Sequence, residues 1–244
     1  MNIFGSVRRR RKTLRLGDSF RNWMKAQWTS SDSRNHRFLA LQPIFNRQRE
    51  IFGYEVLSRS GWDNRFTGDS DAATQMMVDD WMFHGIHEHT GGYRIFLNCT
   101  REALVGGLLT LLPPATVLEL LETVEPDEEV LAACRRMKAL GYHIALDDFQ
   151  DSEKMERLIA LADYVKVDFR LSGKEERREI IRRLKRSAAT LVAEKIETNE
   201  EFEVALAEGF QLFQGYYLGR PKVFSKRKVS TNDVNHFRRM TALS

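Results

Sequence analysis

Short apolar runs alternate with helix-like segments between residues 38 and 217 of the chain. Each run holds four to eight residues, mostly aliphatic or aromatic, between polar, Gly or Pro residues, which predicts a β-strand. Most of the segments between runs carry apolar residues at helical spacing, as at Val130, Ala133 and Met137. The predicted strands are residues 38–45, 53–59, 93–98, 116–119, 143–148, 164–168, 190–194 and 212–217.

The connection between the first two predicted strands differs from all the later ones. Residues 46–51 are too few for a crossover helix, so these two strands can pair only as an antiparallel hairpin. The later strands follow helix-length connections, which favours parallel pairing with right-handed crossovers. No Gly-rich phosphate loop of an open doubly wound sheet follows the first strand. The pattern therefore predicts an α/β fold, a (β/α)8 TIM-like barrel with an antiparallel first strand.

Composition and charge add a basic arm to this picture. Residues 1–36 hold nine Lys or Arg against two Asp, so the net charge of +4 comes from this arm. We expect a flexible arm at 1–36, a barrel domain at 37–222 and a tail with a short helix at 223–244. The arm is either a solvated tail or a weak contact for a membrane surface or nucleic acid, and no specific nucleic-acid polymer is indicated.

Cysteine content and apolar run length narrow the class of protein. Cys99 and Cys134 are too few for a disulfide framework or a paired-cysteine zinc site. No apolar stretch is long enough to cross a bilayer. We therefore expect a cytoplasmic protein in a reducing compartment.

Nearly every predicted strand ends in an acidic or amide side chain. In a barrel of parallel strands these ends meet at one mouth, where unpaired carboxylates would repel one another. A divalent cation relieves that repulsion, and an oxygen-rich set with one amide suits Mg²⁺ or Mn²⁺. Lys166 at the same mouth could counter a phosphate or orient a water. The residues are Glu55, Asn98, Glu119, Asp147, Asp148, Lys166, Asp168, Glu194 and Gln214.

At these residues the sequence resembles the EAL domain, a family of cyclic di-GMP phosphodiesterases. Glu55-Val56-Leu57 is similar to the family's Glu-Ala-Leu, with Arg59 in the place of its phosphate-contacting arginine. Further similar segments are Asn98-Cys99-Thr100, Glu119-Leu120-Leu121-Glu122, Asp147-Asp148-Phe149, Lys166-Val167-Asp168, Glu194-Lys195-Ile196-Glu197-Thr198 and Gln214-Gly215-Tyr216. Finer matches resemble the EAL half of EAL–HDOD proteins, with the HDOD half absent, so a protein partner could replace that half.

The resemblance implies a role for each matched residue. Lys166, Glu194 and Glu55 would be catalytic, with the first two orienting or activating a water that attacks one phosphodiester. Glu55, Asn98, Glu119 and Asp147 would hold one divalent cation, with Asp148 at or bridging to a second. Gln42, Arg59 and Gln214 would contact the substrate. Glu122 would anchor the loop after Asp148, and Asp168 and Glu197 would form a second acidic cluster.

The chain departs from the family pattern beside two of these residues. Gln150 stands where a glycine usually follows Asp-Asp-Phe, and Lys195 replaces a glycine next to Glu194, where its charge could weaken metal binding. The expected function is hydrolysis of cyclic di-GMP to pGpG by a Mg²⁺- or Mn²⁺-dependent enzyme, which could form a homodimer. The alternatives are a catalytically weak or inactive receptor for cyclic di-GMP or a protein-interaction regulator, and an unrelated metal-dependent barrel enzyme.

Overall fold

The computed structural model describes residues 36–59, 69–84, 90–147 and 155–227. The basic arm, Asp148 and the altered loop after it, and the short helix expected in the tail lie outside these residues.

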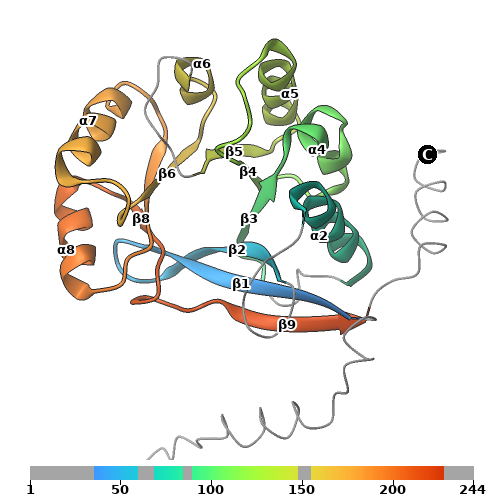
Figure 1. Cartoon of the computed structure of the whole chain (residues 1–244), viewed down its shortest axis with the longest axis horizontal. Coiled ribbons are helices and arrows are strands. Elements are labelled where there is room, and N and C mark those ends of the chain that lie inside the picture. The colour runs from blue at the N-terminus through green and yellow to red at the C-terminus, as the bar shows by residue number, and fades with distance from the viewer. Residues whose placement is uncertain (1–35, 60–68, 85–89, 148–154, 228–244) are drawn as a thin grey trace, which may run out of the picture. The chain divides into compact units, whose positions relative to one another are not determined.

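Within the described residues, eight strands close into a barrel and a ninth strand lies outside it (Figure 1). The ring runs from β2 through β8 in chain order, then to β1, which pairs back to β2. The predicted (β/α)8 barrel is therefore confirmed. The strands are β1 (His36–Asn46), β2 (Ile51–Arg59), β3 (Arg94–Cys99), β4 (Val117–Leu120), β5 (His143–Leu146), β6 (Tyr164–Asp168), β7 (Thr190–Glu194), β8 (Leu212–Phe213) and β9 (Lys222–Arg227).

The first strand runs antiparallel to both of its neighbours in the ring, as its short connection to β2 requires. It pairs with β2 from Phe38 to Phe45, and strands β2 to β8 are parallel to one another. The barrel closes through the pairs Phe45–Phe213 and Asn46–Leu212 between β1 and β8. Strand β1 runs in the opposite direction to the others in the ring. On its inner face a polar residue therefore comes before the apolar residue in the sequence, whereas on the parallel strands the apolar residue comes first.

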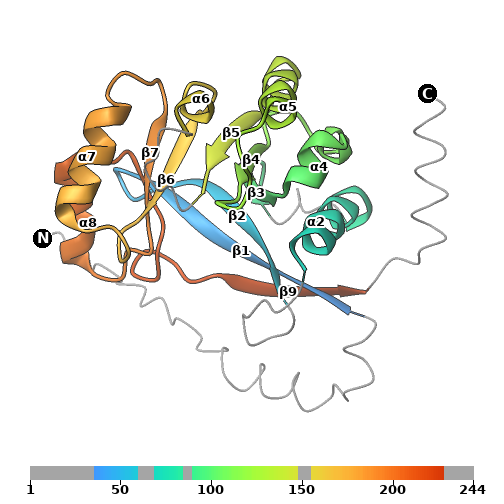
Figure 2. The ribbon, with the colours of Figure 1, turned by 45° about the horizontal axis from the view of Figure 1, so that its top comes forward.

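Helices cover the outer face of the parallel strands, whereas strand β9 runs along β1 (Figures 1 and 2). Outward-facing residues such as Ile95, Leu118 and Val165 are buried in one large apolar cluster beneath these helices. The helices are α2 (Ser70–His84), α4 (Arg101–Val105), the 3₁₀ turn η2 (Leu108–Leu111), α5 (Glu128–Ala139), α6 (Glu156–Ile159), α7 (Lys174–Leu184) and α8 (Asn199–Glu208). None of the described helices has the length and apolar character needed to span a membrane.

Local sequence signals set the ends of the helices that carry the site's loops. Thr198 caps the start of helix α8: its side chain accepts from the Glu201 amide, while the Glu201 carboxylate accepts from the Thr198 amide. The helix ends at Gly209, where a φ of 102° suits glycine. The N-cap Thr198 comes four residues after Glu194, the last residue of β7, so the connection that leaves the barrel mouth is short.

Strand β8 is much shorter than predicted and one further strand, β9, forms, whereas the ends of the other strands agree with the prediction to within two residues. Strand β8 covers only two residues, because the chain soon turns, with the Leu218 and Gly219 amides both donating to the Gly215 carbonyl. Strand β9 was not predicted: its sequence Lys-Val-Phe-Ser-Lys-Arg has only two apolar residues, and only its pairing with β1 makes it a strand. Edge strands of this polar composition carry little periodic signal.

Candidate functional site

The inner face of the barrel carries an apolar layer with a polar layer next to it. On the parallel strands β3 to β8, each polar site residue comes two positions after a buried apolar or aromatic residue, so both point inward. On antiparallel β1 the order reverses, with Gln42 before Ile44. The apolar layer comprises Ile44, Phe96, Val117, Ala145, Tyr164, Val192 and Leu212.

Glycine is required at one place in this packing. A Cβ on Gly53 would lie 2.6 Å from the Arg94 carbonyl oxygen and 3.3 Å from the ring of Phe96. The absence of a side chain at this position of β2 therefore leaves room for Phe96 in the apolar layer.

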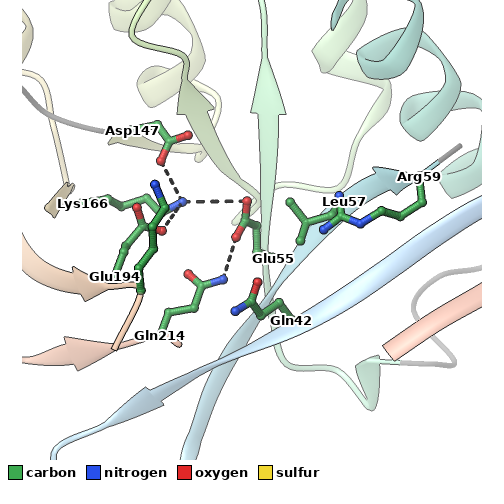
Figure 3. A pocket seen from close by; sticks show the side chains of 9 residues that line it. Gln42, Glu55, Leu57, Arg59, Asp147, Lys166, Glu194 and Gln214 are labelled. Carbon is green, nitrogen blue, oxygen red and sulfur yellow. Dashed lines mark hydrogen bonds and ion pairs between the residues drawn. The ribbon is translucent and has the colours of Figure 1, made fainter. Parts of the chain in front are cut away.

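Lys166 lies at the centre of the polar layer. Its Nζ is 2.8 Å from Glu119 Oε1, 2.8 Å from Glu194 Oε1 and 3.0 Å from Asp147 Oδ1. Glu55 Oε1 is farther, at 3.9 Å (Figure 3). The side chain of Lys166 is 1% exposed and that of Glu119 is not exposed at all. Four strands thus bring carboxylates around one buried ammonium group.

Glu55 joins this cluster to the two amides. Gln214 Nε2 donates to Glu55 Oε2 at 2.6 Å, and Asn98 Nδ2 donates weakly to Glu55 Oε1 at 3.4 Å. The expectation that Glu55 ends a strand is wrong, because Glu55 lies in the middle of β2, which continues to Arg59. The continuation pairs with the long β1 strand.

Burial and charge shift the protonation of the cluster in opposite directions. Burial raises the pKa of Glu119 well above its ordinary value, and it raises the pKa of Glu194 to about 8, although Lys166 opposes both shifts. Burial alone would lower the pKa of Lys166, but the surrounding carboxylates, Asp147 first among them, raise it well above its ordinary value. The ammonium therefore stays charged.

The buried oxygens of this layer fit a divalent cation. Asn98 Oδ1, Gln214 Oε1 and both Glu119 oxygens accept no hydrogen bond of ordinary geometry among the described residues, although Glu119 is ion-paired with Lys166. Buried acceptors without donors are costly, and carboxylate and amide oxygens are ligands that Mg²⁺ and Mn²⁺ take. Among the described residues no group of three or more acidic, His or Cys side chains is arranged to hold a metal ion, and the Lys166 ammonium lies between the carboxylates.

The metal-free protein is expected to lose stability as the pH rises, and divalent cations should restore it. Because the pKa of Glu194 is higher in the folded protein than its ordinary value of 4.5, its bound proton stabilises the fold. This contribution is fully present below pH 4.5 and is lost as the pH rises through about 8. Thermal unfolding with EDTA across that range should therefore show a falling melting temperature. Mg²⁺ or Mn²⁺ should reverse the fall chiefly at the alkaline end, where the carboxylates are ionised. A melting temperature that is flat with EDTA, and unmoved by either metal, would contradict this assignment.

The polar layer opens into a pocket of about 220 Å³. Figure 3 shows the Glu55 carboxylate joined to both Lys166 and Gln214, with Leu57 and Arg59 on the side away from Lys166. Burial lowers the pKa of Arg59 while Glu55 raises it, and Arg59 Nη1 donates to the Ser58 carbonyl at 2.8 Å. The pocket is lined by Gln42, Glu55, Leu57, Arg59, Asp147, Lys166, Glu194, Lys195 and Gln214.

Most of the predicted site residues line this pocket or lie in the polar layer beside it, but some of them do not. The predicted second acidic cluster is held by separate cations: Asp168 pairs with Lys195, and Glu197 pairs with Arg170. Glu122 is exposed, and the loop that it was expected to anchor lies outside the described residues, as does Asp148.

The sequence indicated no role for Leu57, and it indicated only that the charge of Lys195 could weaken metal binding. Both residues nevertheless line the pocket. Leu57 could have been found, because it follows Glu55 by two residues and so faces the same side of the strand. The place of Lys195 at the pocket could not be predicted, because it depends on a bend in the backbone after β7, where Lys195 has a positive φ.

Comparisons with known proteins agree with this arrangement. The chain is 34% identical over 215 residues to the uncharacterized protein YuxH of Bacillus subtilis, covering 85% of this chain and 53% of YuxH. It is 36% identical over 203 residues to the cyclic di-GMP phosphodiesterase CdgJ of Vibrio cholerae, covering 81% of this chain and 47% of CdgJ. The chain thus spans about half the length of these curated relatives.

Solved structures share the fold. The Bacillus subtilis YkuI protein, which has an EAL domain and was crystallised with its substrate cyclic di-GMP and calcium, aligns with a TM-score of 0.63 at 23% identity, over 87% of this chain and 61% of that one. A standalone EAL protein from Vibrio cholerae with bound cyclic di-GMP aligns with a TM-score of 0.58 at 26% identity, over 76% and 92% of the two chains. The sequence model of the EAL domain matches residues 98–221, just over half of this chain. The chain therefore belongs to the EAL domain family.

Proposed function

We propose that this protein is a divalent-cation-dependent phosphodiesterase that hydrolyses one phosphodiester bond of cyclic di-GMP and releases linear pGpG. The observation that carries the proposal is the buried polar layer: carboxylates around Lys166, unpartnered oxygens beside them, and a pocket directly adjoining. The phosphodiesterase CdgJ at 36% identity and the family membership support the same reaction.

Four residues supply the oxygen atoms for the proposed cation. We assign Glu55, Asn98, Glu119 and Asp147 to one Mg²⁺ or Mn²⁺, and Asp148 to a second cation or to a position that bridges to it. When bound, such a cation supplies a lowered pKa for a coordinated water and stabilises charge on phosphoryl oxygens. The chain must then move the Lys166 ammonium away from the centre of the carboxylates, because at 2.8–3.0 Å it occupies their common space.

Other residues of the pocket act on the substrate. The carboxyl of Glu194, with a pKa raised to about 8, can hold or release a proton near neutral pH and so suits proton transfer with the attacking water. The charged Lys166 beside it can donate a hydrogen bond to the water or a phosphoryl oxygen. Arg59 offers a planar fork that suits phosphate oxygens, and Gln42 offers an amide to the ligand.

The test is turnover by the purified chain. Protein with cyclic di-GMP and either Mg²⁺ or Mn²⁺ should yield pGpG on chromatography, and EDTA should stop the reaction. A Glu55→Gln preparation, made in parallel, controls for contaminating nucleases because it loses a proposed ligand. Intact nucleotide with both metals would reject the enzyme. Binding without turnover in the same samples would instead make the chain a cyclic di-GMP receptor.

A further inference from the structure

Lys195 has an unusual backbone conformation at the edge of the pocket. It follows Glu194 directly, lines the pocket, and has a φ of 57°. Three non-glycine residues among the described ones have a positive φ, and of these Lys195 alone lines the pocket. The left-handed region costs an L-residue roughly 1–2 kcal/mol, so the surroundings must hold the chain there.

The neighbouring strands do hold it. The Glu194 carbonyl accepts from the Phe169 amide at 3.1 Å, on the side of β6. On the other side, the Ile196 amide donates to the Gln214 carbonyl at 3.0 Å, and the Ile196 carbonyl accepts from the Tyr217 amide at 3.1 Å. Lys195 thus lies between Glu194, whose backbone is hydrogen-bonded to the residue after β6, and Ile196, whose backbone is hydrogen-bonded to the segment after β8.

The side chain of Lys195 is anchored by a buried carboxylate. Its Nζ pairs with Asp168 Oδ2, and Asp168 Oδ1 accepts the amides of Arg170 at 2.7 Å and Leu171 at 3.1 Å. The Asp168 side chain is 5% exposed, whereas that of Lys195 is 48% exposed. The buried, hydrogen-bonded carboxylate of Asp168 therefore holds the Lys195 ammonium where a ligand in the pocket can reach it.

The pocket is lined by two other cations, and they differ from Lys195. Lys166 is 1% exposed and enclosed by three carboxylate oxygens within 3.0 Å, whereas Lys195 is 48% exposed and pairs with the Asp168 carboxylate. Arg59 belongs to β2, which is separated from β7, the strand before Lys195, by β8 and β1 in the ring. The two accessible cations thus belong to separate parts of the barrel mouth.

We propose that Lys195 is a substrate-binding residue, which contacts a phosphate oxygen of the cyclic dinucleotide from the β7 side while Arg59 contacts the ligand from the β2 side. A lysine ammonium is a compact point charge that suits phosphate. The pocket, at about 220 Å³, is smaller than those that enclose whole drug-sized ligands, so it suits the phosphodiester and ribose part. This inference rests on the proposed function, which supplies the phosphate.

The test measures metal-free binding of cyclic di-GMP by titration in EDTA at two salt concentrations. Lys195→Gly removes the charge and suits a φ of 57°, so the fold should be retained, as its melting temperature will show. We expect binding to weaken about 10-fold at low salt, with a smaller dependence on salt than the wild type shows. Lys195→Arg keeps the charge and should restore most of the affinity.

Lys185→Ala, at an exposed position after α7, is the matched loss of one positive charge and should leave binding unchanged. Equal affinity and equal salt dependence of wild type and Lys195→Gly would overturn the role of Lys195. Such a result would leave the proposed function standing if the wild type still produced pGpG with metal. A wild type that neither binds nor hydrolyses cyclic di-GMP would overturn both.

Discussion

Replacing Lys166 with methionine is expected to lower turnover of cyclic di-GMP by on the order of 1,000-fold and to cost the metal-free protein about 3–5 kcal/mol of folding free energy. Methionine fills a similar length of space, so packing alone changes little. The loss comes from charge, because three carboxylate oxygens within 3.0 Å of Nζ lose their counter-ion in a buried site.

The dependence of this loss on pH and metal separates it from an ordinary packing defect. At acidic pH the carboxyls are protonated, so the difference in unfolding free energy between variant and wild type should shrink. At neutral pH the carboxylates either protonate or bind cation, so Mg²⁺ or Mn²⁺ should raise the melting temperature of the variant more than that of the wild type.

Chemical denaturation of both proteins, with EDTA and with each metal, measures these differences. Lys185→Met, exposed after α7, controls for the loss of a lysine and should unfold like the wild type. Equal stability of Lys166→Met and wild type in EDTA at neutral pH would show that the ammonium does not neutralise the cluster. Undiminished turnover by the variant would remove Lys166 from the reaction.

Most of the barrel could be predicted because each of its strands has a recognisable local sequence pattern. Each inward polar residue from β3 to β8 follows a buried apolar residue by two positions, and the alternation continues across strands that are distant in the sequence. The six-residue connection 46–51 fixed the direction of the first strand by length alone. These signals need no knowledge of which strand pairs with which.

The features that sequence reasoning missed depend on tertiary contacts. Strand β9 forms only because β1 offers it a partner edge. Asp168 follows Lys166 by two residues and was grouped with Glu197, yet the bend at Lys195 brings an ammonium to Asp168 instead. Only the family's glycine at this position hints at the positive φ of Lys195, and that conformation is held by hydrogen bonds to the residue after β6 and to the segment after β8.

Among the glycines that the structure describes, Gly215 is the least able to accept a side chain. A Cβ there would lie 2.0 Å from the carbonyl oxygen of Ile196 and 2.3 Å from its amide nitrogen. Real Cβ atoms do not approach backbone so closely, and the Ile196 backbone cannot move away without breaking its bonds to Gln214 and Tyr217. The segment that carries Glu194 and Lys195 therefore packs directly on the glycine that follows Gln214.

Gly215→Ala is therefore expected to destabilise the protein by more than about 3 kcal/mol, or to prevent folding altogether. Gly173→Ala is the matched control, because no heavy atom lies within 4 Å of its added Cβ and its φ is −67°, so it should cost less than about 1 kcal/mol. Thermal unfolding compares the two variants. If Gly215→Ala folds, the displaced Ile196 segment should also lower cyclic di-GMP turnover at temperatures where the variant is fully folded. A Gly215→Ala protein with wild-type stability and turnover would show that the Ile196 backbone does not lie against this glycine.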